Sequence, residues 1–200
     1  MTSTTDHRPL LRQATPDDLP VVFALLNEAA EWLASRGIDQ WPARFERDNE
    51  WRAQRIEKYV VDGYVYIASD DRGYVGTITL SPNADPDFAH GWPDGPDNAL
   101  YVYRMATMRR AAGRGLGARL LAWAGDRAAR SGRAWLRLDV HRHNPDLQAY
   151  YERLGFVRVG TIVTPPRGSG ALYQRPAQIK PDSRVLDLLT RSPDGQPSDA

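Results

Sequence analysis

The stretch Met105–Leu121 constrains the fold of this 200-residue chain more than any other segment. It holds glycines at 113, 115 and 117, preceded by the apolar run Leu100–Met108 and followed by an amphipathic helical pattern that begins at Leu116. The glycines therefore stand where a strand passes into a helix. Backbone N–H groups at such a turn have no intrahelical acceptor, the helix dipole adds positive charge, and glycine leaves a ligand room to approach. The sequence predicts a site for a phosphate or pyrophosphate here.

The spacing of the glycines narrows the ligand. A dinucleotide-binding turn would read G-x-G-x-x-G and a nucleotide phosphate loop would end in Gly-Lys-Ser/Thr, and neither occurs here. The segment Gly113–Ala118 instead resembles the coenzyme A pyrophosphate loop of GNAT-superfamily N-acetyltransferases, Gln/Arg-x-x-Gly-x-Gly/Ala. Ala112 departs from this pattern, because the family prefers Gln or Arg at its position. An arginine nearby, at 109, 110 or 114, is a candidate for supplying the missing charge.

A second motif supports the resemblance. Residues 144–156 read NPDLQAYYERLGF, which is similar to the family's late signature of an Asn followed by a helix that ends Tyr-Glu-Lys-Leu-Gly-Phe. The resemblance covers roughly Leu10–Arg175 and implies the GNAT fold. That fold is α/β (mixed α+β), with a twisted mixed sheet of about seven strands and helices on both faces.

Composition sets the outer limits. Hydrophobic content of 42% and charged content of 26% are typical of a soluble globular domain. The net charge of +1, the absence of cysteine and the lack of an apolar run near ~20 residues predict no nucleic-acid partner, no membrane span and no metal. We expect a cytoplasmic enzyme, with a homodimer left open. Residues 1–8 are expected to form a flexible N-terminus, 9–175 the N-acetyltransferase domain and 176–200 a disordered tail.

Apolar periodicity and turn residues predict the elements along the chain. The first helix is expected to begin at Thr15, which can cap it, and to end near Gly37. Residues 70–73 give a hairpin signal, and the loop 82–98, with four prolines and four aspartates, is expected to lack regular structure. The expected strands are 10–14, 64–69, 74–81, 99–108, 133–141, 156–163 and 171–174, and the other helices cover 46–59, a run from Leu116, and a short one ending at Gly155.

The resemblance implies acetyl-CoA as co-substrate. The backbone of Met105, Ala106 and Thr107 would pair with the pantetheine arm where this strand splays from its neighbour. Asn144, a good helix N-cap, would also contact the arm, and Tyr151 would lie near the sulfur, with Tyr150 as packing. The pyrophosphate loop would comprise Ala112, Gly113, Arg114, Gly115, Leu116, Gly117 and Ala118.

The expected reaction is acetyl transfer from acetyl-CoA to a primary amine of a small molecule or peptide, by direct attack on the thioester in a ternary complex. An alkyl ammonium has a pKa near ~10, so a base is needed, and Glu28, Asp139 and His141 are the candidates. Tyr151 is the candidate acid for the leaving thiolate. The aspartates of the loop 82–98 favour a cationic acceptor. Candidates to line the acceptor pocket are Trp32, Trp41 and Trp92.

Two alternatives remain at this stage. A non-catalytic acyl-CoA-binding or regulatory module would keep the fold without turnover, and the departure at Ala112 leans that way. An NAD(P)-dependent oxidoreductase would use Asp139, which ends a strand roughly 20 residues beyond the glycines, as its ribose-binding acid.

Overall fold

The computed structural model describes residues 8–45, 50–180 and 186–187, and its strands form one mixed sheet in the order β6-β7-β5-β4-β3-β2-β1-β8. Parallel pairs join β4 to β5 and β1 to β8, and all the other neighbours are antiparallel. The strands are β1 (Leu10–Gln13), β2 (Val65–Asp70), β3 (Gly73–Ser81), β4 (Ala99–Thr107), β5 (Trp135–Val140), β6 (Val157–Thr161), β7 (Ala171–Pro176) and β8 (Leu186–Asp187). The expected fold class and the order of elements are confirmed.

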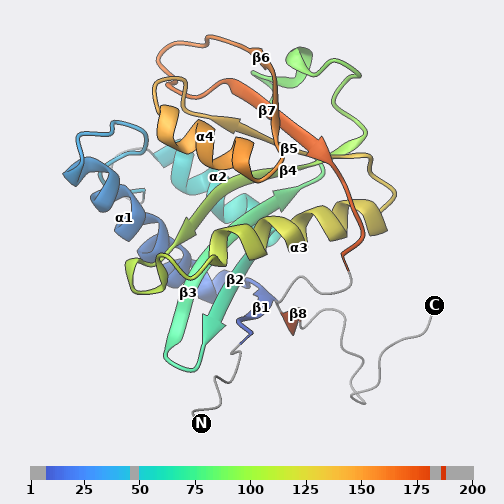
Figure 1. Cartoon of the computed structure of the whole chain (residues 1–200). Helices are drawn as coiled ribbons and strands as arrows, with labels where there is room; N and C mark the ends of the chain where they lie inside the picture. The colour runs from blue at the N-terminus through green and yellow to red at the C-terminus, as the bar shows by residue number, and fades with distance from the viewer. Residues whose placement is uncertain (1–7, 46–49, 181–185, 188–200) are drawn as a thin grey trace.

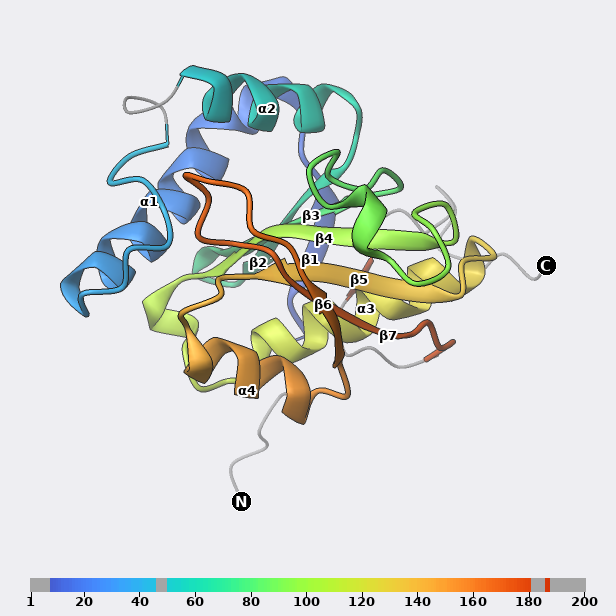
Figure 2. The ribbon, with the colours of Figure 1, turned by 90° about the horizontal axis from the view of Figure 1, so that it is seen from above.

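In the described part of the chain, four α-helices cover the sheet on both faces. They are α1 (Leu19–Ser35), α2 (Glu50–Val61), α3 (Leu116–Arg130) and α4 (Pro145–Arg153). Helices α1 and α2 lie on one face of the sheet, and α3 and α4 lie on the other (Figures 1 and 2). Short 3₁₀ turns occur at η1 (Pro16–Asp18), η2 (Ala89–Gly91) and η3 (Arg109–Ala111). The predicted helix 46–59 is described from Glu50, because residues 46–49 lie outside the described part of the chain.

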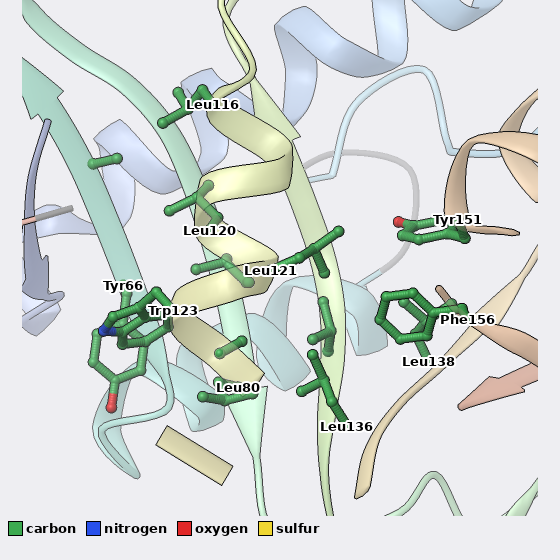
Figure 3. Packing of buried hydrophobic residues seen from close by; sticks show 14 of the residues in the cluster. Tyr66, Leu80, Leu116, Leu120, Leu121, Trp123, Leu136, Leu138, Tyr151 and Phe156 are labelled. Atoms are coloured by element: carbon green, nitrogen blue, oxygen red, sulfur yellow. The ribbon is translucent and has the colours of Figure 1, made fainter. Parts of the chain in front are cut away.

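The apolar face predicted for the helix after the glycines forms the larger core. Leu116, Leu120 and Leu121 are buried and point from α3 toward the sheet, where Leu136 and Leu138 of β5 meet them (Figure 3). A second core lies on the opposite face and joins α1 and α2 to the sheet. Helices on both faces explain why consecutive residues of β2 and β3, whose side chains alternate between the faces, are buried. The cores fix β4 and β5 between the two helix layers.

The C-terminal segment departs from the expected disordered tail. Strand β7 includes Pro176, and residues 186–187 pair in parallel with Leu10 and Leu11 of β1. The Asp187 carboxylate accepts a hydrogen bond from Trp123 Nε1 at 2.8 Å and one from Arg127 at 3.2 Å. The composition of the segment did not predict this pairing. Only two residues pair with the sheet edge, and two are too few to change the polar composition of the segment.

The loop 82–98 is also more ordered than its composition predicts. It contains η2, and its Phe88 and Trp92 are buried with Tyr101 in a third apolar cluster. Arg137 of β5 is fully buried and binds the loop through Asp94 and through the Gly95 carbonyl at 2.6 Å. Buried side chains therefore anchor the loop to the sheet.

Candidate active site

Strands β4 and β5 separate halfway along their length. Their parallel pairing runs from Ala99 opposite Trp135 to Val102 opposite Leu138. Beyond that point β4 continues to Thr107 and β5 to Val140, without further pairing between them. The separation leaves the β5-facing edge of β4 available over the segment Met105–Thr107, as the resemblance predicted.

A β-bulge in β4 lies at the start of the opening. The register of β3 against β4 shifts between Thr77 and Thr79, and Arg104 has φ of 43°, a conformation uncommon for a residue with a side chain. Consecutive residues of a regular strand point to opposite faces. Here Tyr103 stacks on the Tyr59 ring of α2 at 5.9 Å, and the Arg104 guanidinium also lies 5.9 Å from that ring. The bulge therefore turns both side chains toward the same helix.

A cavity of about 510 Å³ occupies the opening. Its walls come from α1 and the segment after it, α2, β4, β5, α4 and the loop between β6 and β7. Many of the residues predicted from the sequence line it, namely Trp32, Trp41, Met105, Ala106, Thr107, Asp139, His141, Asn144 and Tyr151. Among the described residues, Glu28, Trp92 and the loop 112–118 are not part of this lining.

The glycine turn lies at the N-terminus of α3, and its backbone explains its composition. Gly113 and Gly115 have φ of 77° and 72°, and a Cβ at either position would meet no protein atom within 4 Å. Glycine is required there by conformation, and the space above it is open. The N–H groups of the first turn of α3 have no intrahelical acceptor. These features fit an anionic group such as a pyrophosphate.

The three arginines near the turn differ in their partners. Arg110 binds Asp70 through two hydrogen bonds of 3.0 and 3.1 Å. The Arg109 guanidinium lies 4.4 Å from the Trp32 ring, at the cavity wall. Arg114 is exposed beside Gly113 and Gly115. Arg109 and Arg114 are therefore the better placed of the three to compensate for Ala112.

Tyr151 is buried at the end of α4 and faces the cavity. Its ring packs edge-on against Phe156 at 5.6 Å (Figure 3). Burial, followed by the neighbouring Tyr150 and Asp139, raises the pKa of the Tyr151 phenol. The hydroxyl therefore keeps its proton at neutral pH and is available as a hydrogen-bond donor.

Tyr150 packs against the larger core, as expected. It lines the same cavity, and its hydroxyl lies 2.7 Å from where a Cβ on Gly117 would be. The two adjacent tyrosines therefore point to different parts of the site. Tyr150 reaches Gly117 at the start of α3, and Tyr151 lies beside Phe156. A side chain at position 117 would displace the Tyr150 hydroxyl, which is a second reason for glycine there.

Asp139 lies at the end of β5 on the cavity wall. Burial raises the pKa of its carboxyl, and the nearby Asp85 adds to this, whereas the charge of Arg167 and a hydrogen bond from Ser169 oppose it. Asp139 also acts electrostatically on Tyr151. A carboxylate with a raised pKa, close to a protonated phenol, is a chemically competent base.

His141 lines the cavity, but its ring nitrogens are engaged. Nδ1 accepts a hydrogen bond from the His143 backbone N–H at 3.3 Å, and the ring hydrogen bonds with the backbone of Asp39. Burial, with the charges of His143 and Arg142, lowers the pKa of the imidazole. His141 is therefore neutral at pH 7, with the lone pair of Nδ1 already used.

Two predicted site residues lie elsewhere. The Glu28 carboxylate accepts a hydrogen bond of 2.7 Å from the backbone N–H of Arg109, so that it ties α1 to the connection before α3. Trp92 is buried against Tyr101 at 5.6 Å, with Arg137 over its ring at 4.8 Å. The expectation that Trp92 lines the acceptor pocket is wrong, because its ring belongs to the anchor of the loop 82–98.

Asn144 performs the predicted capping and a second task. Its Oδ1 accepts from the Leu147 N–H at 3.1 Å, which caps α4. Its Nδ2 donates to Gln40 Oε1 at 2.9 Å, which joins α4 to the segment after α1. Both Asn144 and Gln40 line the cavity, so this bond spans its rim.

Charged residues that sequence reasoning missed surround the far side of the cavity. Asp85 binds Arg55 at 2.9 Å and Arg167 at 2.8 Å, and Arg167 also binds Asp87 at 2.7 Å. Asp94 is paired with Arg137. Three of the four loop aspartates are therefore paired with arginines, and the attraction of a cationic acceptor by this loop stays a prediction. Arg104 had a detectable signal, because it interrupts an apolar strand.

Neither a membrane-spanning helix nor a metal-binding cluster occurs among the described residues. No helix among them is long and apolar enough to cross a bilayer. Within the same residues, no group of three or more His, Cys, Asp or Glu side chains is arranged to hold a metal ion.

Comparisons with known proteins agree with this geometry. The acetyltransferase (GNAT) family model matches residues 26–156. The uncharacterized N-acetyltransferase YesJ of Bacillus subtilis (strain 168) is 32% identical over 149 residues, which cover 74% of this chain and 81% of YesJ. A GNAT-family acetyltransferase structure from Listeria monocytogenes has a TM-score of 0.69 at 24% identity, covering 84% of this chain and 94% of that one. The yncA structure from Salmonella typhimurium, solved with its cofactor acetyl-CoA, has a TM-score of 0.58 at 18% identity, covering 85% and 94%.

The family match and the divergence of β4 from β5 decide between the acetyltransferase and the alternatives that the sequence left open. The oxidoreductase alternative is wrong, since Asp139 lies in the opening between these strands of an acetyltransferase fold. The relatives support an enzyme over a non-catalytic module. The chain belongs to the GNAT family of N-acetyltransferases, and it is an acyltransferase.

Proposed function

We propose that the enzyme transfers the acetyl group of acetyl-CoA directly to a primary amine while both are bound. The observation that carries this proposal is that Asp139 and Tyr151 line one cavity, where β4 exposes an unpaired edge. A base and an acid in one enclosed space are what aminolysis of a thioester needs.

In this proposal the glycine turn binds the pyrophosphate of the donor. The free edge of Met105–Thr107 binds its pantetheine arm, and Asn144 borders the arm. A backbone N–H of this segment polarises the thioester carbonyl, because a fixed donor stabilises the negative charge that develops on the oxygen. Trp32 and Trp41 line the acceptor side.

Asp139 is the proposed base. Glu28 binds the Arg109 backbone, and His141 already accepts a hydrogen bond at Nδ1, so Asp139 is the candidate with accepting capacity directed to the cavity. Its raised pKa makes it a stronger base than an ordinary carboxylate. Tyr151 then donates a hydrogen bond to the departing sulfur and delivers its proton as charge builds there.

Initial rates with acetyl-CoA and a panel of primary amines, followed by thiol release and by the mass of the product, test the proposal. Direct transfer predicts intersecting double-reciprocal plots and no acetylated enzyme after incubation with acetyl-CoA alone. Parallel plots together with an acetyl-enzyme would contradict direct transfer. Binding of acetyl-CoA without amine-dependent thiol release would favour the non-catalytic alternative.

A further inference from the structure

The cavity carries more positive than negative side chains. Among the described residues, the arginines in its lining are Arg36, Arg52, Arg55, Arg104, Arg109 and Arg167, and the acids are Asp85, Asp139 and Asp146. Arg109 comes four residues before Gly113 in the chain, and its guanidinium lies 4.4 Å from the Trp32 ring at the cavity wall. The arginines at 52, 55, 104 and 167 instead lie on α2, the bulge of β4 and the β6–β7 loop, where an acceptor would enter.

Two of these four acceptor-side arginines are already paired with acids. Arg55 and Arg167 share the buried Asp85, and Arg167 also binds Asp87. Arg52 lies 4.7 Å from the ring of Trp51 at the start of α2. Among the described residues, no hydrogen bond or ion pair reaches the guanidinium of Arg52 or of Arg104. Arg104 differs from Arg52 in its position, because it stands on the bulge of β4 and lies 5.9 Å from the Tyr59 ring.

Arg104 is half-buried and lines the cavity. Burial, together with the charge of Arg55, lowers the pKa of its guanidinium to about 10. The positive φ at this residue adds a conformational cost that a non-glycine residue rarely bears. A half-buried guanidinium without a hydrogen-bonded partner, held by a bulge at the wall of a cavity, is placed to bind an anionic group that enters the cavity.

The position of Asp139 relative to Arg104 indicates which second group the bound anion would carry. Asp139 and Arg104 line the same cavity and act on each other electrostatically, yet no ion pair within 4.0 Å joins them among the described residues. A cation and an acid that face one space without pairing match a molecule bearing both an amine and an acid. The amine would lie toward Asp139, and the acid toward Arg104.

We propose that the acceptor is a small amino acid-like amine whose carboxylate binds Arg104. This inference rests on the proposed function, since it specifies the acceptor of that reaction. A guanidinium binds a carboxylate through two parallel hydrogen bonds, which fixes the distance and direction of the neighbouring amine. In this proposal, the cavity of about 510 Å³ holds the acyl end of the donor together with the amine and the carboxylate of the acceptor.

The experiment compares matched acceptors. The natural L-amino acids, their carboxamides and their decarboxylated amines are assayed with acetyl-CoA by thiol release, for the native enzyme and for Arg104→Gln and Arg104→Lys. We expect at least one amino acid to exceed its own carboxamide and amine in kcat/KM by about 10- to 100-fold, the range of a charge-assisted contact. Arg104→Gln should remove this preference by raising KM for the acid alone, and Arg104→Lys should keep part of it.

The outcomes separate the inference from the function on which it rests. If carboxamides or simple amines are acetylated with the same kcat/KM as the acids, the inference is overturned while amine acetylation stands. If the amines are acetylated and the acids are not, the inference is overturned in the same way. Equal losses on acid and carboxamide in Arg104→Gln would show a structural role and would also overturn it. Calorimetric acetyl-CoA binding by each variant reports that the donor site is intact, and Arg130→Gln, on the exposed face of α3, is the control for loss of an arginine.

Discussion

Val102 and Leu138 are the last residues that pair β4 with β5, and every group proposed to act on the thioester or the amine lies past this pair. Up to this point the two strands hold each other, and beyond it their free edges face the cavity. Leu138 is buried against the α3 layer, which fixes β5 at the place where the strands part. The packing of the core therefore determines where the site opens.

Gly115→Glu should weaken acetyl-CoA binding at least about tenfold, or 1.4 kcal/mol. The substitution places a carboxylate in the open space over the N–H groups of α3, where it excludes a pyrophosphate by volume and by charge. Gly132→Glu is a matched control, because Gly132 has the same φ of 72° and the same open surroundings at the other end of α3. Titration calorimetry measures both, and equal affinities for the two folded variants would sink the assignment of this turn.

Tyr151→Phe should lower kcat by about 10²- to 10⁴-fold, the range of general acid catalysis, with little change in acetyl-CoA affinity. The hydroxyl acts on the leaving sulfur, so its loss is felt mainly in the transition state. Tyr150→Phe should alter acetyl-CoA affinity more than kcat, because the Tyr150 hydroxyl lies at Gly117. Steady-state kinetics and calorimetry on both variants separate the roles. A collapse of kcat in Tyr150→Phe alone would show that Tyr150, and not Tyr151, is the acid.

Asp139→Asn should remove the acid limb of the pH profile of kcat/KM. Because the pKa of Asp139 is raised, its carboxylate is lost as pH falls at a higher value than for an ordinary aspartate. His141→Gln should retain this limb, since Nδ1 of His141 is already hydrogen-bonded. A limb that survives in Asp139→Asn and disappears in His141→Gln would make the histidine the base.

The same substitution has a consequence for stability. A carboxyl whose folded pKa is raised contributes most at low pH, and this contribution is lost as pH rises through that pKa. The ionised Asp139 therefore costs stability at pH 7, and Asp139→Asn should raise the free energy of unfolding there while it lowers activity. Chemical denaturation at pH 7 measures this, and a clear loss of stability would contradict it.

Asp85→Asn should destabilise the fold by about 3–5 kcal/mol at pH 7, because Arg55 and Arg167 would lose their shared buried partner. Burial favours the neutral carboxyl, but the hydrogen bonds of Arg167 and the charge of Arg55 prevail and lower the pKa of Asp85 to about 2. Its contribution is therefore present above the unfolded pKa of ~3.9 and is lost as pH falls toward 2. The difference between native and variant unfolding midpoints should shrink over that range. Asp87→Asn, at an exposed residue, should cost less than about 1 kcal/mol.

The elements that border the proposed donor side were predictable from sequence, because local signals specify them. Periodic apolar residues locate α3, positive-φ glycines mark its start, and Asn144 caps α4 as its residue type predicts. Each of these depends on a few neighbouring residues. The two motifs then place the turn and Tyr151 in one fold.

The acceptor side was not predictable in the same way, because long-range pairing decides it. The aspartates of the loop 82–98 read as a free acidic surface until Arg55, Arg137 and Arg167, from three distant elements, are seen to bind them. Trp92 read as a pocket residue for the same reason. Arg104 is visible in the sequence as a charge within an apolar strand, but the direction of its side chain depends on the bulge. The bulge arises from the register of β3 against β4 and has no local signature.

The pairing of Leu186 and Asp187 with β1 bears on how the protein is handled. The polar composition after Arg175 invites trimming of the chain for crystallisation, but a cut after Lys180 would remove the acceptor of Trp123 Nε1. It would also bare the edge of β1, whose unpaired N–H and C=O groups are a template for pairing with another molecule. The shortened protein should therefore aggregate more readily than the intact chain.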